Sequence, residues 1–517
     1  MPTVEADVEV AIVGGGFSGI GAAIALRRAG IEDFVLLESG DGVGGAWHWN
    51  RYPGVAVDIP SFSYQFSFRQ RPDWSRVYAP GGELRDYARD CVEHFGLQDR
   101  IRLSTTVDGA TWDDEKHVWT LRFREGGGLS ARHVIGATGV FTSPKPPEIP
   151  GVEDFAGTTM HTARWDHDVD LRGKRVALIG TGASAVQVVP SIAKDVESLT
   201  VFQRTPIWCL PKLDGPLPKL LRTAFRRVPG VQRAVRLVSQ AYIELTFPIA
   251  AHYAKAVPVA AATKPLALHH LERQVKDPET RRKLTPDYDL GCKRPGFSND
   301  YLRTFNRANV ELETAPIVSV TKDSIVTGEG ARGPFDVLIL ATGFKVFEPG
   351  NMPAFPVRGV GGTDLERFWA ENRYQAYEGV SVPGFPNLYT ILGPYGYNGS
   401  SYFTLIENQS RHIVRCLNRA RELGATRIEV TAEANARYFR EVLGRRHRQV
   451  FFQGTCGTAN SYYFDAHGDV PFRPSTTLEA RWRSARFDLG DYTFTAPSPR
   501  SPDRSAPSRA APDPRVR

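Results

Sequence analysis

A short glycine-rich turn near the start of the chain constrains the fold more than any other feature. It covers residues 14–19 and follows residues 8–13, an apolar segment rich in β-branched side chains. After the turn, residues 20–29 have helical character, and residues 34–37 are again apolar and strand-like. A strand, a glycine-rich turn, a helix and a second strand in this order predict a βαβ unit of a parallel sheet.

The same order of segments occurs a second time. Residues 180–185 form another glycine-rich turn, which follows the apolar residues 176–179 and precedes a helical pattern from Val186 and a strand pattern at 199–202. Two such units predict an α/β fold with two Rossmann-like dinucleotide-binding domains. The length of 517 residues agrees with more than one domain.

The domains are predicted to be interleaved along the chain. Strand patterns vanish between 209 and 291, where Leu-, Arg- and Ala-rich helical stretches replace them, and return afterwards. The last residues are rich in Pro, Ser, Ala and Arg, a composition typical of disorder. We therefore expect this order: first domain 1–150, second domain 151–208, helical insertion 209–291, second domain 292–340, first domain 341–495 and a disordered tail 496–517.

Composition limits the partners and the location. Part of the net charge of +7 lies in the tail, and no zinc-finger or RNA-binding motif occurs, so we expect no nucleic-acid partner. The five cysteines show neither C-x-x-C spacing nor a disulfide framework, which, with the lack of an export signal, favours a reducing cytoplasm. Residues 235–262 are interrupted by Glu, His, Lys and Pro, so we expect no membrane span, although a peripheral membrane contact stays open.

The first turn has the residues that a dinucleotide needs. Gly14, Gly16 and Gly19 permit a tight turn and a close approach of the pyrophosphate, and the helix N-terminus that follows favours its negative charge. Glu38 ends the next strand, where its carboxylate can accept hydrogen bonds from ribose hydroxyls. The strand, helix and acid around the glycines favour cofactor binding over a merely structural turn.

The second turn differs at the end of its second strand. Arg204 and Thr205 stand there in place of an acid. A guanidinium suits a 2′-phosphate, which an acid would repel, so the pattern favours NADP over NAD. The alternative is that Arg204 is only a surface charge.

Three further motifs carry a resemblance to a known family. Residues 155–166 match F-x-G-x-x-x-H-x-x-x-W-[PD], and residues 44–58 match [AG]-G-x-W-x-x-x-x-[FY]-P-[GM]-x-x-x-D. The third motif, Gly-Cys-Lys-Arg-Pro at 291–295, is similar to a segment that bears a catalytic arginine. With the two glycine-rich turns, these motifs resemble those of the Baeyer-Villiger monooxygenases, which are class B flavoprotein monooxygenases. The Gly-Pro-Tyr-Gly-Tyr-Asn segment at 393–398 looks closer to the short, 4-hydroxyacetophenone-monooxygenase-like members than to the Ser-rich enzymes.

The resemblance implies a reaction. In this family NADPH reduces a bound FAD, O2 adds at the flavin C4a carbon, and the resulting peroxide converts a ketone into an ester or lactone. It implies that Arg294 stabilises this peroxide and the adduct that follows, and that Asp58 orients Arg294. The expected enzyme is an NADPH-dependent flavoprotein monooxygenase that acts on a small ketone and O2.

The resemblance also implies cofactor contacts. Besides Gly14, Gly16, Gly19 and Glu38, the FAD site is expected to include Gly45, Ala46, Trp47, Asp58, Tyr64 and Val107. The NADP pyrophosphate is expected at Thr181, Gly182, Ala183, Ser184, Ala185 and Gln187, and the 2′-phosphate at Arg204, Thr205 and Lys293. No metal is expected, because His269 and His270 have no carboxylate cluster beside them.

Several alternatives stay open. Histidine ordinarily titrates near neutrality, so His161 could be catalytic, but its motif lies in the linker between domains in this family, which favours a role in interdomain geometry. An N- or S-oxygenating flavin monooxygenase has the same fold and cofactors, although Trp165, Asp166 and Arg294 argue against it. A disulfide reductase would need a close redox cysteine pair near the flavin, and the sequence indicates no such pair. A catalytically silent flavoprotein module would be expected to lose Arg294 or the NADP motif, and both are present.

Overall fold

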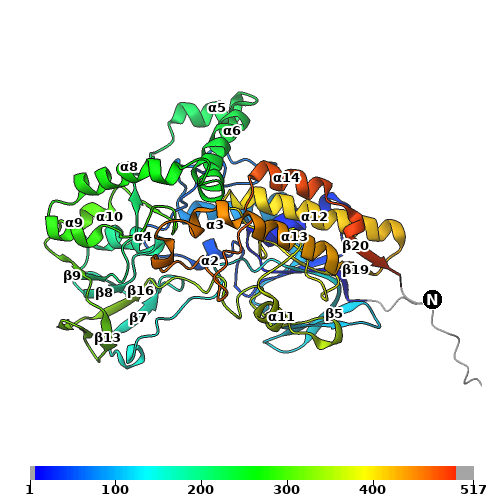
Figure 1. Cartoon of the computed structure of the whole chain (residues 1–517), viewed down its shortest axis with the longest axis horizontal. Helices are drawn as coiled ribbons and strands as arrows, with labels where there is room; N and C mark the ends of the chain where they lie inside the picture. The colour runs from blue at the N-terminus through cyan, green and yellow to red at the C-terminus, as the bar shows by residue number, and fades with distance from the viewer. Residues whose placement is uncertain (1–5, 497–517) are drawn as a thin grey trace, which may run out of the picture.

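Two sheets, each built around one of the glycine-rich turns, form the body of the molecule (Figure 1). The computed structural model describes residues 6–496, so the predicted tail lies, from residue 497 onward, outside the described residues. Two segments that connect the sheets run side by side, with the Lys145 N–H donating to Gly343 O at 2.9 Å and the Lys345 N–H donating to Ser143 O at 3.0 Å. The chain therefore leaves the first sheet and returns to it at one place.

The first sheet has eight strands and is parallel at its centre. There, β1 (Val8–Val13) pairs with β2 (Phe34–Leu37) on one side and with β6 (Gly128–Gly136) on the other. The remaining strands are β3 (Ile101–Arg102), β4 (Val107–Asp113), β5 (Val118–Phe123), β17 (Val357–Arg358) and β18 (Leu388–Thr390). Because β17 and β18 come from the last third of the chain, the N-terminal and C-terminal parts share this sheet.

Helices pack on the first sheet and on each other. α1 (Phe17–Arg28) begins at the first turn and packs against α12 (Tyr402–Leu423), which packs against α14 (Thr477–Arg486). The rings of Phe17 and Phe403 lie 4.6 Å apart and join α1 to α12 through an aromatic core. This part of the chain also contains α2 (Ala46–Trp49), α3 (Gly81–His94), α11 (Leu365–Asn372), α13 (Ala432–Arg445) and the strand pair β19 (Arg427–Val430) and β20 (Tyr492–Thr495).

The second sheet has five strands, all parallel, in the order β12, β9, β8, β16, β7. They are β7 (Thr158–His161), β8 (Arg175–Ile179), β9 (Ser198–Phe202), β12 (Val310–Glu313) and β16 (Val337–Leu340). α4 (Ala183–Ile192) begins at the second turn and packs against α10 (Tyr301–Thr304). A three-stranded antiparallel sheet follows β12, made of β13 (Ile317–Val320), β14 (Ile325–Thr327) and β15 (Gly330–Arg332).

Helices dominate the chain between β9 and β12. Besides α10, they are α5 (Lys219–Arg227), α6 (Val231–Glu244), α7 (Ala250–His252), α8 (Val259–Gln274) and α9 (Pro278–Leu284), with a π-helical turn, Leu245–Ile249, between α6 and α7. β10 (Cys209–Leu210) pairs with β11 (Gly296–Phe297) across this helical stretch. α5 and α6 project from the body of the molecule (Figure 1). None of the helices within residues 6–496 combines the length and the apolar character needed to cross a membrane.

Each glycine-rich turn is closed by a carbonyl group of an Ala-Thr-Gly segment. A Cβ atom on Gly14 would lie 2.6 Å from Ala137 O, and one on Gly180 would lie 2.4 Å from Ala341 O. Both glycines also have positive φ angles, of 116° and 118°. The two units are therefore built alike, and the predicted α/β fold with two Rossmann-like units is confirmed.

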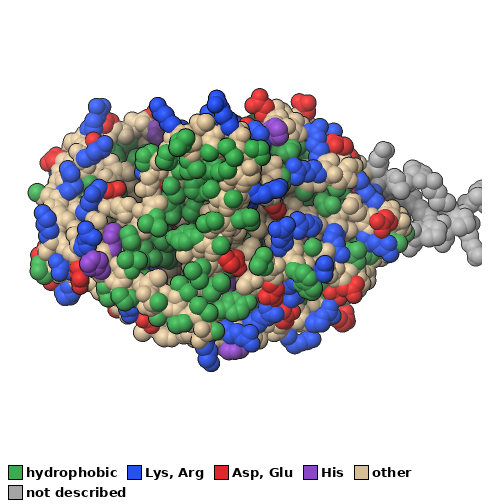
Figure 2. Space-filling model, turned by 90° about the horizontal axis from the view of Figure 1, so that it is seen from above, with side chains coloured by type: hydrophobic (Ala, Val, Ile, Leu, Met, Phe, Trp, Pro, Cys, Tyr) green, Lys and Arg blue, Asp and Glu red, His purple; other side chains and the backbone are tan. Residues whose placement is uncertain are grey.

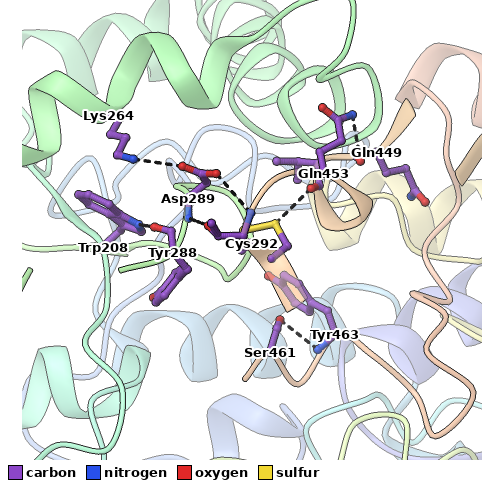
Figure 3. Close-up of a disulfide and its surroundings, with 12 residues drawn as sticks. Trp208, Lys264, Tyr288, Asp289, Cys292, Gln449, Gln453, Ser461 and Tyr463 are labelled. Atoms are coloured by element: carbon purple, nitrogen blue, oxygen red, sulfur yellow. Dashed lines mark hydrogen bonds and ion pairs between the residues drawn. A yellow bond between two sulfur atoms is a disulfide. The ribbon is translucent and has the colours of Figure 1, made fainter. Parts of the chain in front are cut away.

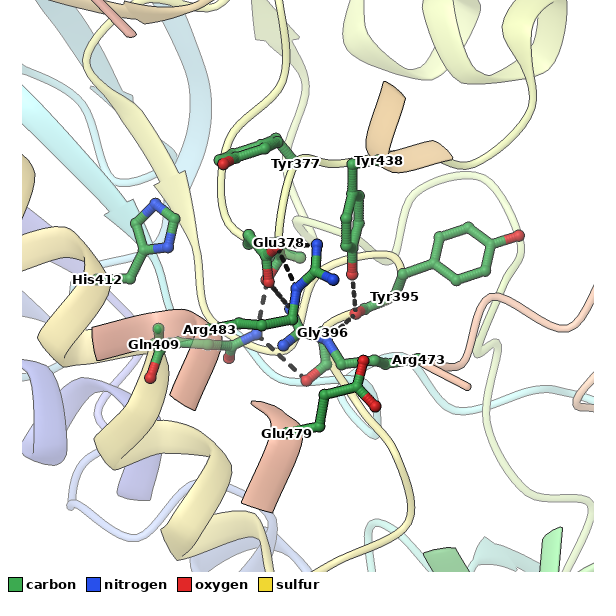
Figure 4. Close-up of polar contacts among 12 residues, drawn as sticks. Tyr377, Glu378, Tyr395, Gly396, Gln409, His412, Tyr438, Arg473, Glu479 and Arg483 are labelled. Atoms are coloured by element: carbon green, nitrogen blue, oxygen red, sulfur yellow. Dashed lines mark hydrogen bonds and ion pairs between the residues drawn. The ribbon is translucent and has the colours of Figure 1, made fainter. Parts of the chain in front are cut away.

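A buried ion network holds the loop that precedes α12 (Figure 4). Glu378 is 3% exposed and forms ion pairs with Arg473 at 2.9 Å and with Arg483 at 2.7 Å. Arg473 Nε also donates to Tyr395 O at 3.1 Å, and the Arg473 backbone N–H donates to Tyr397 O at 2.7 Å. The network therefore fixes the backbone on both sides of residue 396.

We expect Glu378→Gln to destabilise the protein. The substitution leaves the buried Arg473 without its counter-charge, which costs about 3–5 kcal/mol of unfolding free energy. Urea denaturation followed by circular dichroism measures this loss. The matched control is Glu371→Gln, whose ion pair with Arg367 lies at the surface and contributes at most about 1 kcal/mol. Equal losses in the two variants would contradict the role of the network.

Candidate active site

Arg294 and Asp58 form an ion pair where loops of the two units meet. Arg294 lies between α9 and β11, and Asp58 lies between α2 and α3. Arg294 Nε donates to Asp58 Oδ2 at 2.7 Å. The side chains are 20% and 29% exposed, so the pair is largely shielded from water but is still accessible. The structure thus brings together the two residues that the sequence assigns to catalysis.

The two charges of this pair stabilise each other. Burial is the largest single influence and would lower the pKa of Arg294, but the charge of Asp58, the neighbouring Tyr397 and Tyr463 and the hydrogen bond to Asp58 together hold this pKa well above its ordinary value. Burial would raise the pKa of Asp58, but Arg294 and then Lys212 hold it below its usual range. Lys212 approaches the same loop, where its Nζ donates to Val57 O at 3.1 Å. Arg294 is therefore a permanent cation near neutral pH, and Asp58 is its permanent counter-ion.

Aromatic side chains surround the other end of Arg294. Arg294 Nη1 donates to the Tyr397 hydroxyl at 3.5 Å, and the guanidinium lies 5.9 Å from the ring centroid of Phe247. The rings of Tyr397 and Tyr402 are stacked, with centroids 5.1 Å apart. Burial raises the pKa of Tyr397, so its hydroxyl stays protonated and can donate a hydrogen bond. Neither Phe247 nor this role of Tyr397 was predicted, although the tyrosine in a segment that is Ser-rich in other members was a usable signal.

The first turn carries its expected carboxylate. Glu38 accepts hydrogen bonds from the backbone N–H groups of Gly15 at 2.6 Å and Gly40 at 2.7 Å. A Cβ atom on Gly45 would lie 2.8 Å from the Cα atom of Gly16, so the segment that leads into α2 touches the turn. The result is a cradle of backbone atoms beside the N-terminus of α1, which fits the pyrophosphate of FAD.

The other residues expected at FAD lie around this cradle. α2 begins at Ala46, and Trp47 Nε1 donates to the Tyr64 hydroxyl at 3.1 Å. Val107 is buried at the start of β4, two residues after Thr105, whose N–H donates to Glu38 O at 2.9 Å. Segments from the turn, from α2 and from β4 therefore converge on one region.

The second turn is open toward solvent at the start of α4. An added Cβ atom on Gly182 would meet no atom within 4 Å, and Thr181 Oγ1 donates to Thr205 O at 2.7 Å. Ala183 and Ser184 begin the helix, whereas Ala185 is fully buried in the core. An open helix N-terminus of this kind fits a pyrophosphate.

Gln187 forms contacts between the two units that the sequence did not indicate, and its expected place at the pyrophosphate stays a prediction. Gln187 Nε2 donates to Ala56 O at 2.9 Å, and Gln187 Oε1 accepts from the Tyr52 hydroxyl at 3.1 Å. Both ends of the side-chain amide are thus used to hold the loop that leads to Asp58. Sequence spacing places Gln187 at the second turn but contains no information on this contact between the units.

Two cations lie close together beside the second turn. Burial and then the charge of Arg204 lower the pKa of Lys293 to about 8. Asn460, with its amide oxygen turned toward Arg204, accepts from Arg204 Nη2 at 2.7 Å and from Nε at 3.0 Å. Two cations at close range repel each other, and a bound phosphate group would relieve that repulsion. The pair therefore fits the 2′-phosphate of NADP, and Asn460 is a neighbour that the sequence did not indicate.

His161 lies at the end of β7 with both ring nitrogens engaged. The Ala163 N–H donates to Nδ1 at 3.0 Å, and Nε2 lies 3.3 Å from Thr342 Oγ1. Burial, followed by the charge of Arg164, lowers the pKa of His161 to about 4, so the ring is neutral at pH 7. These contacts favour a geometric role over a catalytic one. Within the described residues, no group of three or more His, Cys, Asp or Glu side chains could hold a metal ion.

A disulfide lies two residues before Arg294 (Figure 3). It joins Cys292 to Cys456, which are 164 residues apart, so the expectation that the cysteines form no disulfide is wrong for this pair. Spacing along the chain could not show it, because only the tertiary structure brings the two loops together. The other cysteines, Cys91, Cys209 and Cys416, are buried and free. Because the structure contains a close cysteine pair, the cysteines no longer provide an argument against a disulfide reductase. The location in a reducing cytoplasm stays a prediction.

Known proteins are similar to this chain in sequence and in structure. Residues 11–214 match the family described as pyridine nucleotide-disulphide oxidoreductase. A Baeyer-Villiger monooxygenase of Pseudomonas aeruginosa is 38% identical over 502 residues, which cover 96% of this chain and 93% of that protein.

Solved structures extend the likeness to the whole fold. OTEMO in complex with FAD and NADP superposes with a TM-score of 0.84 at 27% identity, covering 95% of this chain and 100% of that chain. Cyclohexanone monooxygenase from Rhodococcus sp. Phi1 bound to NADP+ superposes with a TM-score of 0.83 at 28% identity, covering 95% and 99%. Because this chain is 38% identical to the Pseudomonas aeruginosa enzyme over nearly its full length, and Arg294 and Asp58 are in contact, the chain belongs to the Baeyer-Villiger monooxygenase family.

Proposed function

We propose that this protein is an NADPH-dependent flavoprotein that inserts one oxygen atom from O2 beside the carbonyl group of a ketone, forming an ester or a lactone. The contact between Arg294 and Asp58 is the observation that carries the proposal. Asp58 binds Nε, so the terminal nitrogens of Arg294 are directed to other partners. Bound FAD supplies the activated oxygen for this reaction, and NADPH supplies the electrons.

Arg294 stabilises the charge that develops during the reaction. When the carbonyl carbon of a ketone is attacked, negative charge develops on the carbonyl oxygen. A guanidinium that is fixed beforehand in a site with little water can lower the energy of that charge by several kcal/mol. Asp58 keeps Arg294 in place, and the protonated Tyr397 hydroxyl provides a second hydrogen-bond donor beside it.

One of the proposed NADPH contacts lies on the same loop as the catalytic cation. Lys293, which we propose at the 2′-phosphate together with Arg204, directly precedes Arg294 in the sequence. A phosphate that binds Lys293 therefore also restrains the backbone of Arg294. Thr181 and Gly182, at the open N-terminus of α4, are the residues that we propose at the pyrophosphate.

Arg294→Ala should lose ester formation while it still consumes NADPH. Removing a cation that acts on the developing charge lowers the rate of product formation by about 100- to 1,000-fold, whereas the residues proposed for cofactor binding stay intact. Mass spectrometry of products from a panel of ketones and one thioether measures this loss, with NADPH consumption followed in parallel. Arg303→Ala, which removes an exposed arginine paired with Asp300, is the matched control.

Two results of that experiment would overturn the assignment. Unchanged ester formation by the Arg294→Ala protein would show that Arg294 is not the stabilising cation. A wild-type protein that oxidises the thioether and none of the ketones would assign the chain to N- or S-oxygenation.

The apparent affinity for NADPH should fall as the pH rises through about 8. The pKa of Lys293 is about 8, so its ammonium group, which attracts the 2′-phosphate, is lost above that pH. We expect the KM for NADPH to rise across this range, while the KM for NADH, which lacks the phosphate, changes little. Lys293→Arg should remove the pH dependence, because a guanidinium stays protonated. A KM for NADH that rises in parallel with that for NADPH would exclude Lys293 as the cause.

A further inference from the structure

Helix α6 turns its polar side toward the protein. Four of its side chains hydrogen-bond inward: Gln232 donates to Arg71 O at 2.8 Å, Arg236 to Gln65 O at 2.8 Å and Gln240 to Ser400 Oγ at 3.0 Å, and Ser239 Oγ accepts from Ser63 Oγ at 2.7 Å. An amphipathic helix on a globular protein ordinarily buries its apolar stripe and exposes its polar one. α6 instead turns these polar side chains inward, and of its apolar side chains Ile243 is buried with them, at 3% exposed.

The apolar stripe of α6 faces solvent. On α6, Leu237 is 66% exposed and Val238 73%, and Leu245, the first residue of the π-helical turn that continues α6, is 47% exposed on the same side. Leu220 on α5 is 81% exposed. Seen from the side from which α5 and α6 project, apolar side chains gather over this part of the molecule, with Lys and Arg side chains around them (Figure 2).

α14 extends this apolar surface. Its Thr477 N–H donates to Glu244 Oε1 at 2.8 Å, so the start of α14 adjoins the end of α6. Leu478 is 75% exposed and Trp482 is 59% exposed. We call the surface formed by Leu220, Leu237, Val238, Leu245, Leu478 and Trp482 the α6 face. Exposed apolar surfaces of this extent mark places where proteins bind a partner or a membrane.

Positive charge predominates around the α6 face, because the acids at its edge are engaged within the protein: Glu244 accepts from the Thr477 N–H, and Glu479 pairs with Arg445 at 2.6 Å. Residues 215–243 contain six Lys and Arg residues, at 219, 222, 226, 227, 233 and 236, and no Asp or Glu. Arg226 pairs with Asp73 at 3.5 Å, and Arg236 is engaged inside the protein. Within residues 6–496, no ion pair involves the other four cations. The surface therefore offers unneutralised positive charge beside exposed leucines.

We propose that the α6 face docks onto an anionic membrane surface, with the apolar stripe in the headgroup region and the cations against the lipid phosphates. Leucine and tryptophan next to a cluster of Lys and Arg is the composition of helices that lie in the membrane interface. Pairing of this face with a second copy would bring two sets of unpaired cations close together, which disfavours a dimer. Nucleic acid would neutralise the cations but would leave the leucines in water.

The docked face is connected to the active site. Phe247 follows Leu245 by two residues in the same helical run and lies 5.9 Å from the Arg294 guanidinium. A membrane at the α6 face would thus lie next to the proposed oxygenation site and would present water-insoluble ketones to it. This last step rests on the proposed function, whereas the docking itself does not.

The test is co-sedimentation of the full-length, FAD-loaded protein with lipid vesicles. We expect binding to vesicles that contain phosphatidylglycerol, little binding to pure phosphatidylcholine, and weaker binding at higher salt. Leu237→Gln with Val238→Gln should lower the vesicle affinity by about 10-fold or more. Arg227→Gln with Arg233→Gln should lower it by about 30-fold, which corresponds to ~1 kcal/mol for each cation.

The controls carry single substitutions of the same kinds on other surfaces. Val318→Gln replaces a valine that is 55% exposed on β13, and Arg124→Gln replaces an exposed arginine between β5 and β6. Both should bind vesicles as the wild type does. FAD absorbance and thermal unfolding establish that every variant is folded.

The proposal is overturned if the wild type binds no vesicles, if its vesicle affinity is the same with and without phosphatidylglycerol, or if the α6-face variants bind as well as the controls. A dimer in analytical ultracentrifugation that Leu237→Gln dissociates would assign the face to a second copy instead. None of these measurements uses catalytic activity, so a failure of docking and a failure of the proposed oxygenation can be told apart.

Discussion

The ion pair between Asp58 and Arg294 is the interaction on which the rest of the active site depends. Its residues are 236 positions apart, one on a loop after the first turn and the other on a loop after the helical stretch. A partly buried guanidinium and carboxylate are costly to separate, because each would be left with an unpaired charge. The two loops are therefore placed relative to each other by electrostatics, and the site exists only where they meet.

Other contacts support this pair from outside. Gln187 holds the loop that leads to Asp58, and the disulfide of Cys292 anchors the loop that leads to Arg294. The ion pair of Glu378 with Arg473 gives a third support, because the Arg473 N–H donates to Tyr397 O and the Tyr397 hydroxyl accepts a hydrogen bond from Arg294. Each support comes from a different part of the chain, so the position of Arg294 reflects the packing of the whole molecule.

The orientation of α6 follows another constraint. Its inward hydrogen bonds satisfy buried polar groups of the first unit, and these would be costly to leave without partners. Turning the helix to bury its leucines would break those bonds. The exposed stripe is thus a consequence of a polar interface inside, and it leaves an apolar surface for a partner outside.

Much of the site could be predicted because its signals are local. The glycines of the two turns, Glu38 and Arg204 occupy fixed places in βαβ units, whose geometry is set by backbone sterics within some thirty residues. The motifs that carry Asp58 and Arg294 are likewise short and continuous. Local rules of this kind cannot predict which distant loops will meet.

The sequence by itself determined the two Rossmann-like units and the family that supplies the chemistry. Only the tertiary structure decided the bond between Cys292 and Cys456, the contact of Tyr397 with Arg294 and the outward turn of the α6 leucines. The physical reason is the range of the interactions. Strand, turn and helix patterns follow from neighbours in the chain, whereas pairings between distant residues follow from the packing free energy of the entire fold.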